Sequence, residues 1–466
     1  MKATAFQGNA QLASLFLARG AEINAQDDNG FTALHIAAER GITEYVAFLL
    51  SRNADAELPS RNGRMGFGIT DNNGLHPLFL AAQNGHVEVV KLLLDAAAGP
   101  NYTMFANKIL EPVPALQEQQ QEKKYALKHG SKTQVSVPEG WSPLCTAAAN
   151  GHLDVIQVLV DWKSMPEAVC KKMATTALYC AATYGQFNAV KYLLSHGADV
   201  DARHDPEGWT PLLVAIEHDN LAVAELLLDH GADPTIPLIR GSRHHTPLYR
   251  ANWNSNDRMV ELLLRKSTKF DTDALMGSDY MPVNLAALYG NAKILKLFLE
   301  QGMGLNLLRA DQDGRTALHL AARDAFLEGV DMLLDAGFDA TAKDHRGQNV
   351  LHYAAASGSL RMVEKILGLA CAPELAKAPA DWTPLHWAAR SGEARVVEKL
   401  MAAGIEETVV KTFHPERLWT PWAVAWATGN WKLILNTRCP LRLRDEADVQ
   451  EPQAHHWDAL QLQDLL

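Results

Sequence analysis

The stretch Trp382–Gly404, WTPLHWAARSGEARVVEKLMAAG, decides the fold. Thr383 and Pro384 favour a helix start, since a threonine hydroxyl can cap the first amide groups and proline fits the first turn. Apolar residues then recur at helical spacing. Gly392 can adopt the left-handed conformation that ends a helix. We therefore predict a short helix from Thr383 to Gly392.

A second apolar stripe follows in the same stretch. Val396, Val397, Leu400 and Met401 recur at helical spacing, and Gly404 can end this helix in turn. The first helix has only about two turns, which is too short to persist alone in water. The helix pair must therefore stack on other elements.

The start of this helix pair recurs along the chain. Its positions are Thr32, His76, Ser142, Thr176, Thr210, Thr246, Met281, Thr316, Asn349, Thr383 and Thr420. A period near 33 residues with a TPLHxAA core is typical of ankyrin repeats. Over roughly residues 1–437 the chain resembles the ankyrin repeat family, and in particular the arrays of fungal multi-ankyrin proteins. The resemblance implies an all-α ankyrin-repeat solenoid of stacked helix-turn-helix units with β-turn fingers.

Composition and charge narrow the class of protein. The chain has 466 residues, 47% of them apolar, and a formal net charge of −11. This balance argues against binding nucleic acid, which requires a basic stripe. Five cysteines lack the spacing of a disulfide framework or a zinc site. No signal peptide or apolar run of about twenty residues is apparent, and we expect a monomeric protein of the cytoplasm or the nucleus.

Irregular spacing divides the chain into segments. We expect an N-terminal half-repeat or cap at 1–28, repeats at 29–98 with an extended finger at 57–70, an insertion or degenerate repeat at 99–138, regular repeats at 139–437 and a tail at 438–466. The long finger reads either as a contact loop or as a tolerated insertion. A true cap requires its apolar residues Phe6, Leu12, Leu15 and Phe16 to be covered by the next repeat.

The histidines, which could act in catalysis or bind a metal, mostly occupy repeat positions. His35, His319, His352 and His386 are the fourth residue of the TPLH core, where the family uses the imidazole to bond across helix starts. The adjacent pairs His244–His245 and His455–His456 lack further ligands at zinc spacing. We find no catalytic residue, no metal site and no cofactor motif.

Aromatic and arginine side chains are the candidate contacts with a partner. In the family, the residues before the helix start and before the helix-ending glycine face the concave groove, and Trp, Tyr and Arg are common interface anchors. The alternative is that each tryptophan packs on a neighbouring finger and stiffens the stack. The candidates are Trp141, Tyr184, Trp209, Arg240, Arg243, Trp253, Tyr289, Arg323, Trp382, Arg390 and Trp419.

These patterns predict a non-enzymatic scaffold that binds a protein partner through the concave groove and the finger loops. Stacked repeats leave an extended surface for a partner and no enclosed pocket for catalysis. Two alternatives stay open: a substrate-recognition adaptor of a larger assembly such as a ubiquitin ligase, and a detached sensor array of a multidomain receptor. A catalytic activity in 99–138 is disfavoured, because this segment lacks paired acids, a nucleophile or a metal cluster.

Overall fold

The computed structural model describes residues 1–60, 76–97, 142–161, 177–204, 208–240, 243–266, 282–301, 310–372, 375 and 382–405, with short pieces between 410 and 430. The expected insertion 99–138, the tail 438–466 and most of the finger 57–70 lie outside these ranges. Contacts divide the chain into two compact units. The first unit comprises Met1–Ala286 with Lys293–Leu307, and the second comprises Ala287–Ala292 with Leu308–Leu466.

Helix pairs make up the first unit. They are α1 (Lys2–Gln7) with α2 (Ala10–Ala18), α3 (Ala33–Arg40) with α4 (Thr43–Ser51), α5 (Pro77–Gln83) with α6 (Val87–Ala97), α8 (Pro143–Asn150) with α9 (Leu153–Val160), α12 (Pro211–Glu217) with α13 (Leu221–Asp229), and α14 (Pro247–Trp253) with α15 (Asp257–Lys266). The helix α11 (Phe187–Ser195) belongs to the same series, and α16 (Pro282–Leu288) and α17 (Ala292–Gln301) span the boundary between the units.

The second unit repeats the same design. Its pairs are α18 (Ala317–Arg323) with α19 (Leu327–Asp335), α20 (Val350–Ala356) with α21 (Leu360–Leu367), and α23 (Pro384–Ser391) with α24 (Ala394–Ala402). Strands β3 (Val410–Lys411) and β4 (Leu418–Trp419) form a short antiparallel hairpin. The stretch from which the fold was predicted therefore folds as the pair α23–α24.

Each first helix begins at the residue that the repeat pattern indicated. Thr32 caps α3, and its hydroxyl lies 2.9 Å from Nδ1 of His35. The same box forms between Thr316 and His319, between Asn349 and His352, and between Thr383 and His386. The imidazole therefore returns a hydrogen bond to the helix start, which satisfies a backbone group that would otherwise lack a partner. The predicted framework role of the TPLH histidines is confirmed.

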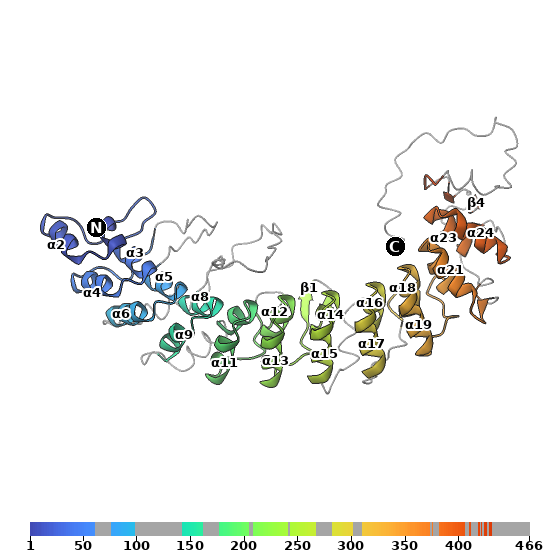
Figure 1. Ribbon diagram of the computed structural model, residues 1–466, viewed down its shortest axis with the longest axis horizontal. Coiled ribbons are helices and arrows are strands. Elements are labelled where there is room, and N and C mark those ends of the chain that lie inside the picture. The colour runs from blue at the N-terminus through green and yellow to red at the C-terminus, as the bar shows by residue number, and fades with distance from the viewer. Residues whose placement is uncertain are drawn as a thin grey trace, which may run out of the picture. The chain divides into compact units, whose positions relative to one another are not determined.

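Helices stack in two rows within the first unit (Figure 1). First helices contact first helices, as in α3–α5–α8 and α12–α14, while second helices contact second helices, as in α4–α6–α9–α11–α13–α15. In each unit, we call the surface at the first helices the first-helix face. Small residues of the AA pair, such as Ala37 and Ala38, are fully buried and let neighbouring helices approach. The predicted all-α ankyrin solenoid is confirmed.

Side chains also bond across repeat boundaries, just before the second helix. His86 donates to the carbonyl oxygen of Glu39 at 2.9 Å, and His152 does the same to Gln83 at 2.9 Å. Position 41 requires glycine, because its φ is +71° and an added Cβ would lie 2.4 Å from Nδ1 of His86. These bonds occupy carbonyl groups that the end of a helix leaves free.

One finger of the first unit is a β-hairpin. Strand β1 (Leu238–Arg240) pairs antiparallel with β2 (Arg243–His245), with Leu238 opposite His245 and Arg240 opposite Arg243. The finger leads directly into the N-cap Thr246 of α14. A sequence that departs from the repeat consensus therefore still builds the finger that the family pattern implies.

The N-terminal half-repeat does not meet the condition set for a cap. Phe6, Leu12, Leu15 and Phe16 are exposed by 48%, 36%, 58% and 40%. Arg40 at the end of α3 covers part of Phe6, since its guanidinium carbon lies 4.4 Å from the ring centre, but the four side chains as a set are not covered. The residues that α1 and α2 bury include Ala5 and Ala13, which are completely buried.

Candidate functional site

The predicted contact residues lie in different environments. Trp253, the last residue of α14, and Tyr289, just after α16, are exposed by 47% and 44%. Trp141 lies outside the described residues. For Arg240, Arg243 and Trp419 the structure describes the strand backbone, in β1, β2 and β4.

Tyr184 belongs to a small core cluster instead of an open surface. It is half-buried and packs against the buried residues Cys145, Ala149 and Cys180. Burial raises the pKa of its hydroxyl to about 12. The side chain therefore contributes to the packing between two neighbouring repeats.

Trp209 and Trp382 are half-buried against neighbouring side chains. The guanidinium carbon of Arg250 lies 5.7 Å from the centre of the Trp209 ring. The ring centre of Trp382 lies 5.2 Å from that of Trp387. Both tryptophans therefore pack on side chains of helices, Arg250 of α14 and Trp387 of α23, whereas the alternative from the sequence placed each one on a neighbouring finger.

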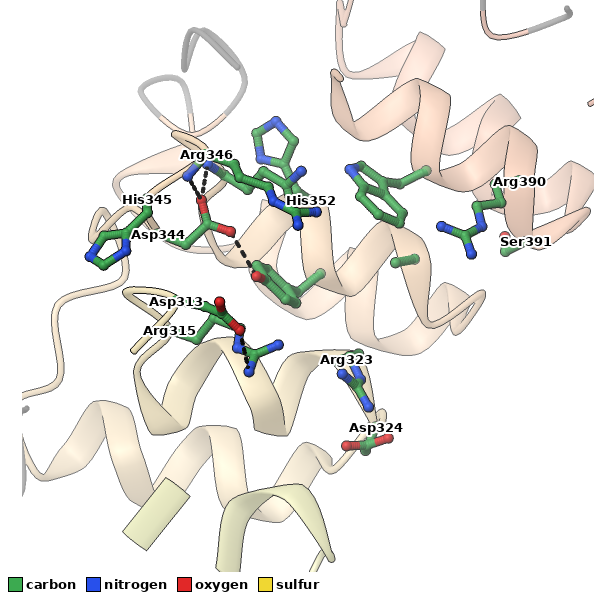
Figure 2. A pocket seen from close by; sticks show the side chains of 14 residues that line it. Asp313, Arg315, Arg323, Asp324, Asp344, His345, Arg346, His352, Arg390 and Ser391 are labelled. Carbon is green, nitrogen blue, oxygen red and sulfur yellow. Dashed lines mark hydrogen bonds and ion pairs between the residues drawn. The ribbon is translucent and has the colours of Figure 1, made fainter. Parts of the chain in front are cut away.

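A hollow of about 410 Å³ opens within the second unit, where three successive repeats contribute side chains (Figure 2). We call it the α18–α23 hollow. Its lining includes Arg323 and Asp324 at the end of α18, residues of the finger and helix α20, and Arg390 with Ser391 at the end of α23. The full set is Asp313, Arg315, Arg323, Asp324, Asp344, His345, Arg346, Gln348, His352, Tyr353, Ala356, Trp387, Arg390 and Ser391.

Asp344 is occupied by donors of its own finger and helix. Its carboxylate accepts hydrogen bonds from the backbone amides of Arg346 and Gln348, at 2.8 and 2.7 Å, and from the hydroxyl of Tyr353 at 2.7 Å. Burial, with the bond to Asp344, raises the pKa of Tyr353. The neutral hydroxyl of Tyr353 on α20 therefore binds the carboxylate of Asp344 and holds the preceding turn, residues 344–348, against the helix.

Arg315 is neutralised by the preceding turn. Its Nε lies 2.8 Å from Oδ2 of Asp311, and its Nη2 lies 2.7 Å from Oδ2 of Asp313. Asp311 also accepts from the backbone amide of Arg315 at 2.7 Å. This cation is bound on two sides and leaves little capacity for a ligand.

On the α23 side of the hollow, two hydrogen-bond donor atoms lack acceptors in the described residues. Nε1 of Trp387 and Nη1 of Arg390 are buried and make no hydrogen bond in the described part of the chain. The guanidinium carbon of Arg390 lies 5.3 Å from the centre of the Trp387 ring. Burial lowers the pKa of Arg390, since desolvation disfavours the charged form. Such unsatisfied donors are costly, by about 1–3 kcal/mol each.

Two framework histidines lie beneath this surface. The ring of His352 bonds to the Asn349 side chain at 2.8 Å, and burial lowers its pKa to about 3, with His319 nearby adding to the effect. Burial also lowers the pKa of His319, whose Nε2 bonds to the carbonyl oxygen of Ala342 at 3.1 Å. Both rings are therefore neutral near pH 7 and serve the packing of the repeats.

In the first unit, an arginine of a first helix has an ion-pair partner. Arg250 on α14 forms an ion pair with Glu217 on α12, with Nε 3.1 Å from the carboxylate oxygen and Nη2 closer still. Asn254 donates to the same oxygen at 3.3 Å. By contrast, Arg346 and Arg390 form no ion pair in the described residues. The α18–α23 hollow therefore carries positive charge that the chain leaves open.

The structure brings together two of the predicted residues, Arg323 and Arg390, in this hollow. Sequence reasoning missed Trp387, Tyr353 and Arg346. A signal existed for the first two: they follow the TPLH histidine, where other repeats bury a residue such as Ile36, Leu80, Val214 or Leu320. A large aromatic or polar residue at this position indicates a side chain that reaches the first-helix face.

Comparison with known proteins decides the family. The sequence model described as "Ankyrin repeats (3 copies)" matches residues 1–104, 115–204, 167–237, 200–274, 248–344 and 336–411. The chain belongs to the ankyrin repeat family. Ankyrin repeats are a general protein-interaction module, and the family and fold are typically non-catalytic.

The chain spans less than a quarter of the length of two curated relatives that it matches. The ankyrin repeat and KH domain-containing protein mask-1 of Caenorhabditis elegans is 28% identical over 237 residues, which cover 50% of this chain and 8% of that protein. The ankyrin repeat protein nuc-2 of Neurospora crassa is 29% identical over 253 residues, 52% of this chain and 22% of that protein. The human ASB11 ankyrin repeat domain aligns with 57% of this chain and 96% of its own, at 24% identity and a TM-score of 0.39.

Two kinds of feature are absent from the described residues. None of the helices in these ranges is long and apolar enough to cross a membrane. Within the same ranges, no group of three or more His, Cys, Asp or Glu residues is placed to hold a metal ion.

Proposed function

We propose that this chain is a non-enzymatic scaffold that holds a protein partner on the first-helix face, the concave groove of an ankyrin array, with help from the finger loops. The observation that carries the proposal is the exposure of Trp253 and Tyr289, by 47% and 44%. Each lies at the end of the first helix of its own repeat. Exposed large aromatic side chains are common anchors of protein interfaces.

Neighbouring groups hold Trp253 in place. Its ring stacks on Tyr249, with centres 5.9 Å apart, and Tyr249 in turn packs on His245 of the finger at 4.6 Å. A side chain that is already held in one position loses little conformational entropy when a partner covers it. This arrangement supports a role for Trp253 as an anchor and gives the finger a part in positioning it.

Affinity capture with mass spectrometry tests the proposal. The tagged chain is compared with the double variant Trp253→Ala/Tyr289→Ala and with the control Phe187→Ala/Met401→Ala, whose exposed residues lie on second helices. We expect the groove variant to lose its captured protein and the control to retain it. Circular dichroism must show that both variants stay folded. Equal capture by the folded groove variant would overturn the assignment of the first-helix face.

A further inference from the structure

We propose that the α18–α23 hollow binds the carboxylate of an acidic side chain, aspartate or glutamate, on the partner's polypeptide. This inference rests on the proposed function, because it assumes that the partner is a protein. The anchoring residues are Arg390 and Trp387, with Arg346 adding positive charge from the neighbouring finger. Figure 2 shows Arg346 and Arg390 on the same hollow, contributed by different repeats.

The charges inside the hollow explain why an anion is the expected ligand. Asp344 is occupied by two backbone amides and Tyr353, and Asp313 pairs with Arg315. Two of the three carboxylates in the lining are therefore committed to the framework, and the third, Asp324, follows the cationic Arg323 at the end of α18. Arg346 and Arg390 have no such partner in the described residues, although the chain as a whole carries a net charge of −11.

The unsatisfied atoms point to the same chemistry. Nε1 of Trp387 and Nη1 of Arg390 are both hydrogen-bond donors that can never accept. Both atoms are buried, so a ligand bonds them once the two side chains turn toward the hollow. Their complement is a group with several acceptor lone pairs and a negative charge. A carboxylate has about four acceptor positions, and the planar guanidinium matches its geometry in paired hydrogen bonds.

Size and position favour a side chain of a protein segment. The hollow measures about 410 Å³ and lies at the ends of the first helices of the second unit. A single acidic side chain fills only part of this volume, so flanking residues of the segment can contact Arg323 and Ser391. The site therefore fits an acidic residue within an extended peptide.

A peptide array tests the assignment. Decapeptides in matched sets carry Glu, Gln or phosphoserine at one central position, and the purified chain is probed at low and high salt. We expect retention of the Glu peptides, at least about tenfold weaker binding of the Gln counterparts, and weaker binding at high salt. Binding of Gln and Glu peptides to the same extent, or of phosphoserine peptides alone, would overturn the proposal.

Three variants locate the bound carboxylate. Arg390→Ala and Trp387→Phe should each weaken binding of the Glu peptides by about tenfold or more, since each removes a donor to a charged group. Arg395→Ala should leave binding unchanged, because Arg395 is an exposed arginine of α24 in the same unit. Unchanged binding by a folded Arg390→Ala variant, checked by circular dichroism, contradicts the site.

The two proposals fail in distinguishable ways. If no acidic peptide binds but capture of a protein still depends on Trp253 and Tyr289, the carboxylate site is wrong and the scaffold function stands. If no acidic peptide binds and capture of a protein does not depend on Trp253 and Tyr289, both proposals are wrong.

Discussion

Asn220 donates from Nδ2 to the carbonyl oxygen of Ala182 at 2.8 Å, and so joins the repeat of α12–α13 to the one before it. The same atom lies 3.0 Å from the carbonyl oxygen of Thr183. His86 and His152 hold the corresponding position in their own repeats and also donate to the preceding repeat. One position just before the second helix thus links successive repeats with chemically different side chains.

Asn220→Ala should lower the free energy of unfolding by about 1–2 kcal/mol, because it leaves carbonyl groups at the end of a helix without a donor. Asn220→His should recover most of this loss, since His86 and His152 make the equivalent bond. Urea unfolding followed by circular dichroism measures both. A histidine variant as unstable as the alanine variant argues against the bond as the cause.

Leu385→Ala should destabilise the second unit by about 2–5 kcal/mol, because it removes a buried core side chain. Leu385 is completely buried in α23, between the repeats that stack on it. The control is Met401→Ala in α24, an exposed position where we expect a change within about 0.5 kcal/mol. Similar unfolding curves for the two variants would refute the assignment of Leu385 to the buried face of α23.

Arg250 and Arg390 should respond in opposite ways to replacement by methionine. Arg250→Met leaves Glu217 without its ion pair and should lower stability by about 1–3 kcal/mol. Arg390→Met removes a buried donor that has no partner, so stability should stay the same or rise. Thermal unfolding of the two variants checks this contrast, and a loss of stability in both means that Arg390 has a structural role.

The stability of the array should fall as the pH drops below 6.5, in part because of His352. Burial lowers the pKa of this histidine to about 3 in the folded chain, whereas the ordinary value is 6.5. Between these values the unfolded chain takes up a proton that the folded chain does not. The His352 contribution is therefore complete above pH 6.5 and is lost by up to about 1.4 kcal/mol per pH unit below it.

Urea unfolding at pH 7.5 and pH 5.0 checks this effect. The comparison is His352→Asn, which copies Asn284, the residue at the same repeat position of α16. The wild type should lose more stability between the two pH values than the variant does. Parallel losses would show that other groups produce the pH dependence.

The fold was predictable because its determinants are local and repeated. Thr383, Pro384 and Gly392 mark the ends of one helix, and copies of this pattern fix the others. The exposure of Tyr289 does not follow from its repeat position alone, because Tyr184 holds the same position in its own repeat and is half-buried. The α18–α23 hollow was harder to predict, because it depends on which cations already have partners. Arg250 and Arg390 are both arginines of first helices, at different repeat positions. Only the structure shows that Arg250 pairs with Glu217 while Nη1 of Arg390 has no partner in the described residues.

The N-terminal half-repeat shows the opposite limit. Its sequence has the apolar residues of a packed helix pair, yet Phe6 and Leu15 are exposed while Ala5 and Ala13 are buried. Helical periodicity places Phe6 and Leu15 on apolar faces, but it does not tell which face the next repeat contacts. That choice depends on the three-dimensional packing of α1 on α3.

Site-specific photo-crosslinking tests the central claim most directly, namely that a protein partner lies on the first-helix face. A photoreactive amino acid is placed at Trp253 or Tyr289, and in separate chains at Phe187 or Met401 on second helices. The protein recovered by affinity capture is then identified in each covalent adduct. We predict that the captured protein is crosslinked from Trp253 and Tyr289 alone. Crosslinking of the same protein from Phe187 and Met401 instead would contradict the account.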